Sequence, residues 1–235
     1  MRCLTLLMTC VTLAPIVAGC AASAGGSELA SRPKTLALSA EAGKVIRLPA
    51  DGAFSIRHQQ SSQVAELGGE ATGQASLTES NAARASATVT AGGSASGVFQ
   101  LGHAFRNESD QQVDLLVRVK LSYAYDASNE PREARPDASV SLNVFARDGR
   151  NRLIRSMPLV NHTTEQGDAR SQGQEDVSFV ATLGPAESLS VWVAGSARAD
   201  VKPERSASAS VQVSGVSIEV ETRPAPPVRT ASRGG

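Results

Sequence analysis

The 235-residue chain has 23 Lys and Arg against 23 Asp and Glu, so its formal net charge is zero. Both signs are interspersed, and the concentrated basic patch of a nucleic-acid binder is missing from the sequence. Its three cysteines stand at positions 3, 10 and 20, so residues 21–235 form neither a disulfide nor a thiolate metal site. Aromatic residues make up only 3% of the chain, and we therefore expect a core of Val, Leu and Ala.

Residues 1–19 differ from everything that follows. Arg2 gives a positive start, and residues 4–17 are mostly apolar. This stretch is too short to cross a bilayer as a helix, which takes about 20 residues. Its length, charge order and ending in small residues are typical of a secretory signal peptide.

Directly behind the apolar stretch lies Val17-Ala18-Gly19-Cys20. These four residues resemble the lipobox of bacterial lipoproteins, in which an aliphatic and two small residues precede an obligatory cysteine. The resemblance implies cleavage after Gly19, a diacylglycerol thioether on Cys20 and acylation of the new α-amine. Two or more acyl chains hold a protein stably on a membrane, so a membrane is the expected partner. Ala21, the residue after the lipidated cysteine, favours the outer membrane where the organism has one. The rest of the chain carries no family motif that we identify.

An ordinary signal peptidase offers the alternative. Ala22-Ser23-Ala24 is an A-x-A site, and cleavage after Ala24 would release the protein without an anchor. We prefer the lipobox, because Ala-Ser runs are common in this chain and a well-placed lipobox is not.

Alternation of apolar and polar residues dominates from Lys34 onward and predicts β-strands. It is clearest in residues 112–126, where every odd position from Val113 to Tyr125 is apolar or aromatic. Residues 99–105 alternate in the same way, and the turn residues 107–110 between these two segments predict a hairpin. A second hairpin is predicted at Asp148-Gly149-Arg150-Asn151, between strands at 139–147 and 153–157.

Three further strands follow, at 177–183, at 189–199 and at about 206–222. In the last of these, the apolar residues move from odd to even positions around Gly215, where we expect a β-bulge. Before residue 95 the pattern is weaker. We expect short strands at 36–38, 45–48 and 54–56, a helical turn at 62–67, and a slim strand or ordered loop at 72–91.

About eight antiparallel strands, each with one polar face, predict an all-β fold. We expect a two-sheet antiparallel β-sandwich of jelly-roll or immunoglobulin-like type. The expected organisation is a signal peptide at 1–19, a lipid-anchored flexible tether at 20–33, a single domain at 34–222 and a disordered tail at 223–235.

A search for catalytic patterns finds none. Gly93-Ser94-Ala95-Ser96-Gly97 has alanine where a G-x-S-x-G nucleophile would stand. His58, His103 and His162 are far apart in sequence. His103 lies on the same face of its predicted strand as the apolar residues around it, which favours a hydrogen-bonded core histidine. We therefore predict neither catalytic residues nor a cofactor.

Two segments have alternative interpretations. The oxygen-rich loops 126–137 and 163–176 resemble calcium-binding loops in composition but match no calcium motif, so polar strand connections are favoured over a metal site. Four arginines lie on or beside the predicted 148–151 turn: Arg147, Arg150, Arg152 and Arg155. We favour a solvated turn over an anion-binding tip.

Trp192 is the main candidate for ligand contact. Trp192 stands between Val191 and Val193 in the sequence, and in a regular strand its side chain points to the opposite face from theirs. It would stack on a sugar or anchor a protein if exposed, but a covered central strand would bury it. Tyr123 and Tyr125 are further candidates, with capping of the core as the alternative.

We therefore expect a lipid-anchored cell-envelope protein whose non-enzymatic sandwich binds or organises a protein or a glycan. The alternative is a lipid-anchored hydrolase of envelope polysaccharide, which needs two acidic residues facing each other across about 5 to 9 Å.

Overall fold

A computed structural model describes residues 35–39, 41, 43–49, 53–78 and 81–224. The expected signal peptide, Cys20, the tether and the tail beyond residue 224 lie outside these residues. The described part consists of twelve strands and one three-residue 3₁₀ turn, η1 (Thr164–Gln166). No helix within the described ranges is long and apolar enough to cross a membrane.

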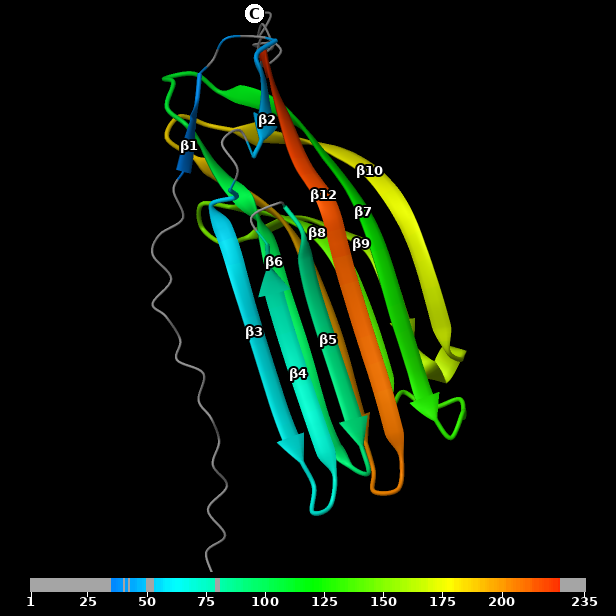
Figure 1. Ribbon diagram of the computed structural model, residues 1–235. Helices are drawn as coiled ribbons and strands as arrows, with labels where there is room; N and C mark the ends of the chain where they lie inside the picture. The colour runs from blue at the N-terminus through cyan, green and yellow to red at the C-terminus, as the bar shows by residue number, and fades with distance from the viewer. Residues whose placement is uncertain (1–34, 40, 42, 50–52, 79–80, 225–235) are drawn as a thin grey trace, which may run out of the picture. The chain divides into compact units, whose positions relative to one another are not determined.

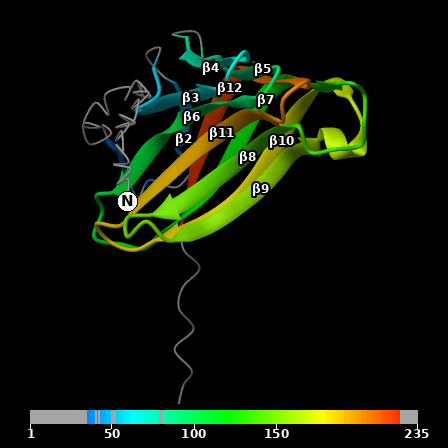
Figure 2. The ribbon, with the colours of Figure 1, turned by 90° about the horizontal axis from the view of Figure 1, so that it is seen from below.

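The strands form two packed sheets, so the predicted all-β sandwich is confirmed (Figure 1, Figure 2). Sheet A contains β1 (Thr35–Leu38), β3 (Ile56–Ala65), β6 (Gly93–Asn107), β8 (Ala138–Asp148), β9 (Leu153–Thr163) and β11 (Ser188–Val201). Sheet B contains β2 (Val45–Leu48), β4 (Glu70–Leu77), β5 (Ala83–Thr90), β7 (Val113–Glu130), β10 (Ala169–Leu183) and β12 (Ser206–Pro224). Strand β12 runs to Pro224 and so takes in the first two residues of the expected tail.

The last eight strands have jelly-roll connectivity. They pair as a long hairpin rolled on itself, with β5 against β12, β6 against β11, β7 against β10 and β8 against β9. Pairing of β12 with β7 and of β11 with β8 completes the two sheets. The jelly roll is thus the correct one of the two predicted types, and β1–β4 extend its edges. Strand β1 runs parallel to β6, whereas the other pairs are antiparallel.

The predicted hairpin between residues 99–105 and 113–125 is wrong. These segments belong to β6 and β7, which lie in different sheets. Alternation reports which face of a strand is buried, but it does not report which strand is its neighbour. The link between them is held by buried Asn107, whose amide nitrogen donates to Gln111 O at 2.7 Å and to Gly184 O at 3.0 Å.

The N-terminal predictions need two further corrections. Residues 62–67 are not a helical turn, because β3 runs through Ala65. Residues 72–91 hold two strands, β4 and β5, joined by a turn, rather than one slim strand or a loop.

The turn and bulge predictions in the second half are confirmed. The β8–β9 hairpin turns at Asp148–Asn151, where Asn151 N donates to Asp148 O at 2.9 Å. In β12 the register with β7 shifts between Ser214 and Ser217, and Gly215 has a φ of +60°. A glycine suits this bulge because a side chain is strained in that conformation.

The core changes character along the sandwich. Around the ends of β6, β7 and β11 near Asn107 it holds large side chains, among them Phe105, Leu115 and Leu189. Towards the other end, which we call the thin end, buried alanines replace them: Ala83, Ala85, Ala87, Ala95, Ala127, Ala138, Ala197, Ala199, Ala207 and Ala209.

Two glycines show how closely the sheets approach at the thin end. A Cβ on Gly97 of β6 would lie 2.0 Å from the Gln74 carbonyl oxygen of β4, in the opposite sheet. A Cβ on Gly73 of β4 would lie 2.4 Å from the Ser96 carbonyl oxygen of β6. The backbones of the two sheets are therefore in direct contact, and most of the buried side chains near them are alanines, with Val89, Val140 and Val201 as larger exceptions.

We predict that Gly97→Ala destabilises the fold by about 1–3 kcal/mol, because the new methyl group must push β4 and β6 apart. Urea denaturation of the full chain measures the change. Gly149→Ala is the matched control, since a Cβ there meets nothing closer than 3.4 Å. Equal midpoints for Gly97→Ala and the unmodified protein would contradict direct backbone contact.

Candidate functional site

The outer face of sheet B is hollowed along the thin end of the sandwich. Three neighbouring hollows of about 470, 870 and 730 Å³ follow β12 and β7 from Ser206 to Ser214. Eight residue steps at about 3.4 Å each make this surface about 27 Å long. We call it the polar groove. Its outward-facing lining includes Ser76, Arg84, Thr88, Thr90, Ser122, Ala124, Asp126, Ser128, Arg170, Gln172, Gln174, Ser206, Ser208, Ser210, Gln212 and Ser214.

Strand register sets these side chains in rows. One row crosses β4, β5, β12, β7 and β10. In it, Ser76 pairs with Arg84, Arg84 with Gln212, Gln212 with Ala124, and Ala124 with Gln172. Apart from Gln212 and Asp126, short Ser and Ala side chains along β12 and β7 form the floor. The longer Arg and Gln side chains of β5 and β10 rise beside it, so the face is hollow rather than flat.

The groove ends where the charged half of the sheet begins. Beyond the Gly215 bulge, cross-strand ion pairs cover the face: Lys120 with Asp176 at 3.6 Å, and Arg47 with Glu219 at 3.1 Å. In the groove, Arg84, Arg170 and Asp126 form no ion pair with another described residue. The groove therefore offers neutral hydroxyl and amide groups, two guanidinium groups and the carboxylates of Asp126 and Glu130 for hydrogen bonding to a ligand. The Arg132–Asp168 ion pair lies at its edge.

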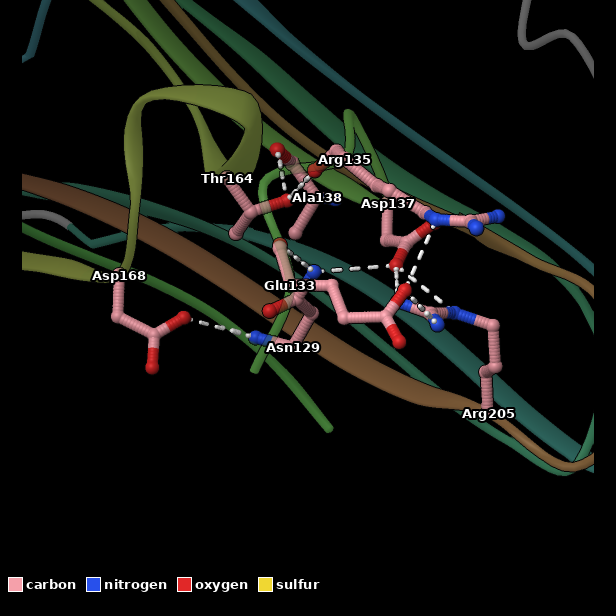
Figure 3. Close-up of polar contacts among 8 residues, drawn as sticks. All are labelled: Asn129, Glu133, Arg135, Asp137, Ala138, Thr164, Asp168 and Arg205. Carbon is pink, nitrogen blue, oxygen red and sulfur yellow. Dashed lines mark hydrogen bonds and ion pairs between the residues drawn. The ribbon is translucent and has the colours of Figure 1, made fainter. Parts of the chain in front are cut away.

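One end of the groove is bounded by a polar cluster around Arg205, drawn in Figure 3. Arg205 lies in the β11–β12 turn, and its Nε donates to Asp137 Oδ2 at 3.0 Å while Nη1 donates to Glu133 Oε2 at 2.9 Å. Asn129, at the end of β7, donates from Nδ2 to the same Asp137 oxygen at 3.0 Å and to Glu133 O at 2.9 Å. Pairing with Asp137, and then with Glu133, raises the pKa of Arg205 above its ordinary value.

The cluster joins the two oxygen-rich loops of the sequence. Asn129 N donates to Asp168 Oδ1 at 3.1 Å, and buried Thr164 donates from Oγ1 to Arg135 O at 2.5 Å. The guanidinium group of Arg205 therefore supplies the positive charge between the carboxylates of Asp137 and Glu133. In the described part of the chain, no three His, Cys, Asp or Glu side chains gather in a way that would hold a metal ion.

Trp192 faces away from Val191 and Val193, as its parity predicts, but only 9% of it is exposed. On the outer face of sheet A its ring stacks on Phe145 with the centroids 5.5 Å apart, and the guanidinium carbon of Arg147 lies 5.5 Å from its centroid. The indole is therefore covered by its neighbours and presents no open stacking surface.

Tyr123 and Tyr125 border the hollows, but their side chains turn inward. Both pack against the hydrophobic core. The Tyr123 hydroxyl lies over Gly173, where a Cβ would come within 2.6 Å of it, and the Tyr125 ring lies 5.9 Å from that of His162. They cap the core, and the three aromatic candidates do not come together.

The histidines are likewise separate. His103 is buried and accepts a hydrogen bond at Nδ1 from Ser55 N at 3.2 Å, which confirms the hydrogen-bonded core histidine. His162 Nε2 lies 2.8 Å from Gly167 O, and His58 is exposed on β3.

The arginine-rich hairpin is partly self-paired. Arg152 Nε donates to Asp148 Oδ2 at 2.6 Å, and Arg147 donates to Asn151 at 2.9 Å. The backbone N–H of Arg152, helped by its side chain and by the N–H of Arg150, lowers the pKa of Asp148. Arg150 and Arg155 extend into solvent.

Sequence reasoning missed the polar groove. Residues 83–90 carry a signal for it, because small apolar and polar residues alternate there. Since nearly all of the apolar members are alanine, the pattern predicts only a slim strand or an ordered loop at 72–91. The Arg205–Asp137 pair spans 68 positions and carries no local signal.

No protein-family model matches the chain, and no curated protein sequence matches it. Among solved structures, a GH51 α-L-arabinofuranosidase in complex with arabinose aligns with 82% of this chain at 11% identity and a TM-score of 0.27. The chain spans about a third of that enzyme, 32% of its length.

Two smaller structures align over nearly their whole length. The CBM22-1 xylan-binding domain of Paenibacillus barcinonensis Xyn10C is 15% identical, with 77% of this chain and 97% of that domain covered and a TM-score of 0.21. A family 11 carbohydrate-binding module from Clostridium thermocellum is 9% identical, with 74% and 97% covered and a TM-score of 0.21. Scores this low assign neither a family nor a ligand to the chain.

We predict that Thr164→Val lowers the free energy of unfolding by about 1–3 kcal/mol, because the buried Ala138 N–H, which donates to Thr164 Oγ1 at 3.0 Å, loses its acceptor. Chemical denaturation measures the loss. Thr90→Val, on an exposed position of β5, is the control. A Thr164→Val protein as stable as this control would contradict the role assigned to the hydroxyl.

Proposed function

We propose that this chain is an exported, lipid-anchored binding module of the bacterial cell envelope, and that its polar groove binds an extended glycan. The observation that supports the proposal is the groove itself, about 27 Å of hollowed sheet face lined by Ser, Thr and Gln side chains. A polymer rich in hydroxyl groups matches such a lining, since each hydroxyl both donates and accepts hydrogen bonds.

The lining favours a glycan over other polymers. Protein interfaces depend on buried aromatic and arginine anchors, whereas the aromatic side chains next to this groove turn inward. Nucleic acid would need a concentrated basic surface, and Asp126 lies between Arg84 and Arg170. Because the described lining of the groove holds no outward-facing aromatic side chain, we expect modest affinity from direct and water-mediated hydrogen bonds.

The first described strand lies away from the polar groove. Strand β1 lies beside the end of β6 at the thick end of the sandwich, with Leu38 opposite Asn107 (Figure 1). The groove follows β12 and β7 at the thin end. The fourteen residues 21–34 span at most about 50 Å when fully extended. A tether of this length would allow the groove of a domain anchored at Cys20 to face away from the membrane.

We predict that Gln172→Ala with Gln212→Ala weakens glycan binding about tenfold or more, because two hydrogen bonds of about 1 kcal/mol each are lost. Affinity electrophoresis of the full chain in gels containing purified envelope polysaccharides measures the shift. Gln100→Ala, on the outer face of sheet A, is the matched control. If no polysaccharide retards the protein, or if the double variant is retarded equally, the groove is not the glycan site.

The same polysaccharides test the hydrolase alternative. Release of new reducing ends by the unmodified protein, and its loss in Asp126→Asn, would replace the binding role by an enzymatic one.

We predict that Cys20→Ser moves the protein from the membrane fraction to the soluble fraction, because the substitution removes the thiol that the lipid modifies. Mass spectrometry of the N-terminal peptide identifies the acyl chains directly. A mature protein that begins at Gly25 in both forms would show cleavage after Ala24 and would contradict the anchor.

A further inference from the structure

Strand β3 forms a free edge of sheet A. It pairs with β6 along one side only, and nine of its ten residues are exposed. Both faces of β3 are therefore open to solvent, whereas β6, β8 and β11 each bury one face. The row of main-chain N–H and C=O groups along such an edge is a template on which another strand can pair.

The hydrogen bonds to β6 show which residues of β3 face the free edge. Just beyond the ladder, Glu66 N donates to Gly92 O at 3.2 Å. In an antiparallel pair, residues that bond the neighbouring strand alternate with residues whose N–H and C=O groups point away from it. The even-numbered residues of β3 therefore bond β6. The odd-numbered ones turn their N–H and C=O groups to the free edge, and they are Arg57, Gln59, Ser61, Gln63 and Ala65.

The described part of sheet B leaves this edge open. A Cβ on Gly73 of β4 would lie 2.3 Å from Ser62 O of β3 and 2.4 Å from Ser96 O of β6. The edge strand β4 of sheet B thus lies over the ladder between β3 and β6, and β3 projects beyond it at the margin of the sandwich (Figure 1). This position explains why even the inward-facing residues of β3, such as Gln59 and Ser61, are exposed.

The other long edge strands carry features that hinder pairing. Strand β9 is interrupted by Pro158 and by two register shifts. Strand β10 carries one arginine and two carboxylates in its first eight residues. In β4, Gly73 N already donates to Gln63 Oε1 at 3.2 Å. Strand β3 contains no proline, glycine, lysine or acidic residue, and Arg57 near its start is its one arginine. It therefore lacks the usual protection of an edge strand.

We propose that β3 pairs antiparallel with β3 of a second copy of this chain, with Gln60 opposite Gln60 across a twofold axis. Only registers that place odd residues opposite odd residues bring the free N–H and C=O groups of the two edges together. The register centred on Gln60 does so. It pairs residues 56–64 of both copies and forms about eight main-chain hydrogen bonds.

The side chains favour this register and a second copy as the occupant. At both ends of the pairing Ile56 stands opposite Val64 of the other copy, and Val64 is 65% exposed in the single chain. Apolar side chains directly opposite each other stabilise a sheet. The two Arg57 positions are six residue steps apart, about 20 Å, so like charges do not meet. The next permitted register, centred on Ser61, places Val64 opposite His58 instead.

Such pairing would join the two copies of sheet A into one continuous sheet. Residues directly opposite each other in a sheet point to the same face, so the inward-facing residues of both copies, and with them both copies of sheet B, lie on one side. On the proposed glycan function, the two polar grooves then open to that same side, which raises the avidity for a polymer that reaches both. The pairing itself rests on β3 alone and depends on neither the anchor nor the groove.

Disulfide trapping in cells tests the register. We expect Gln60→Cys to give a disulfide-linked species of twice the chain's mass on a non-reducing gel, because a non-hydrogen-bonded pair brings its Cα atoms to about 4.5 Å, within disulfide reach. Ser62→Cys is the matched control. It lies on the same face of β3, but its counterpart is four residue steps away, about 14 Å, which is too far for a disulfide. The unmodified chain gives the background from its own cysteines.

Sedimentation equilibrium of the purified full chain in density-matched detergent measures the dimer. We expect Gln60→Lys to raise its dissociation constant at least tenfold, because the substitution places two like charges directly opposite each other. Ser156→Lys adds the same charge to exposed β9, at the other edge of sheet A, and should leave the dissociation constant unchanged.

The outcomes separate the possible occupants and the two proposals. A monomeric unmodified chain overturns the dimer, as does equal weakening by the two lysine variants. Crosslinking of Ser62→Cys as complete as that of Gln60→Cys overturns the register. A Gln60→Cys adduct whose mass includes a different protein overturns the second copy as occupant. Gln60→Lys should still be retarded by glycan in the gel, so failure of the dimer leaves the groove standing, and failure of glycan binding leaves the dimer standing.

Discussion

Direct contact between the backbones of β4 and β6 is the constraint on which the thin end of this sandwich depends. Gly73 and Gly97 permit it, because a Cβ at either position would clash with a carbonyl oxygen of the other sheet. Sheets usually pack about 10 Å apart with side chains filling the space between them. Here the space is narrower, and most of the buried side chains are alanines. The alternation of alanine with serine, threonine and arginine along β5 follows from this contact.

A thin core buries little apolar surface per residue, so polar interactions are needed to hold the loops together at that end. The Arg205 cluster does so: Asp137 and Glu133 join the β7–β8 loop to the β11–β12 turn, and Thr164 joins η1 to the same loop. The Arg205 and Asp137 side chains are each only 12% exposed. Burying a charged pair costs desolvation, and that cost is offset only where geometry is good and the remaining hydrogen-bonding groups find partners. This cluster meets both conditions, and it forms one rim of the polar groove.

The same small residues shape the outer face. Where the inside of β12 carries alanine, its outside carries serine, so neither face has a bulky side chain and the groove floor is low. The aromatic residues that sequence parity made candidates for ligand contact are instead part of the framework. Trp192 packs under Arg147, while Tyr123 and Tyr125 close the core edge. Hydrogen-bonding chemistry is therefore what remains for recognition at the groove.

The sequence by itself determined the fold class, most strand positions, the β8–β9 hairpin and the Gly215 bulge, because each of these is written in local alternation and turn chemistry. It also determined which face of β11 Trp192 occupies, and it carries the four-residue lipobox resemblance. Only the tertiary structure decided that β6 and β7 lie in different sheets, that Trp192 is covered, and that Arg205 meets Asp137. These outcomes depend on contacts between residues tens of positions apart, and period-two alternation records only whether a side chain is buried, not what buries it.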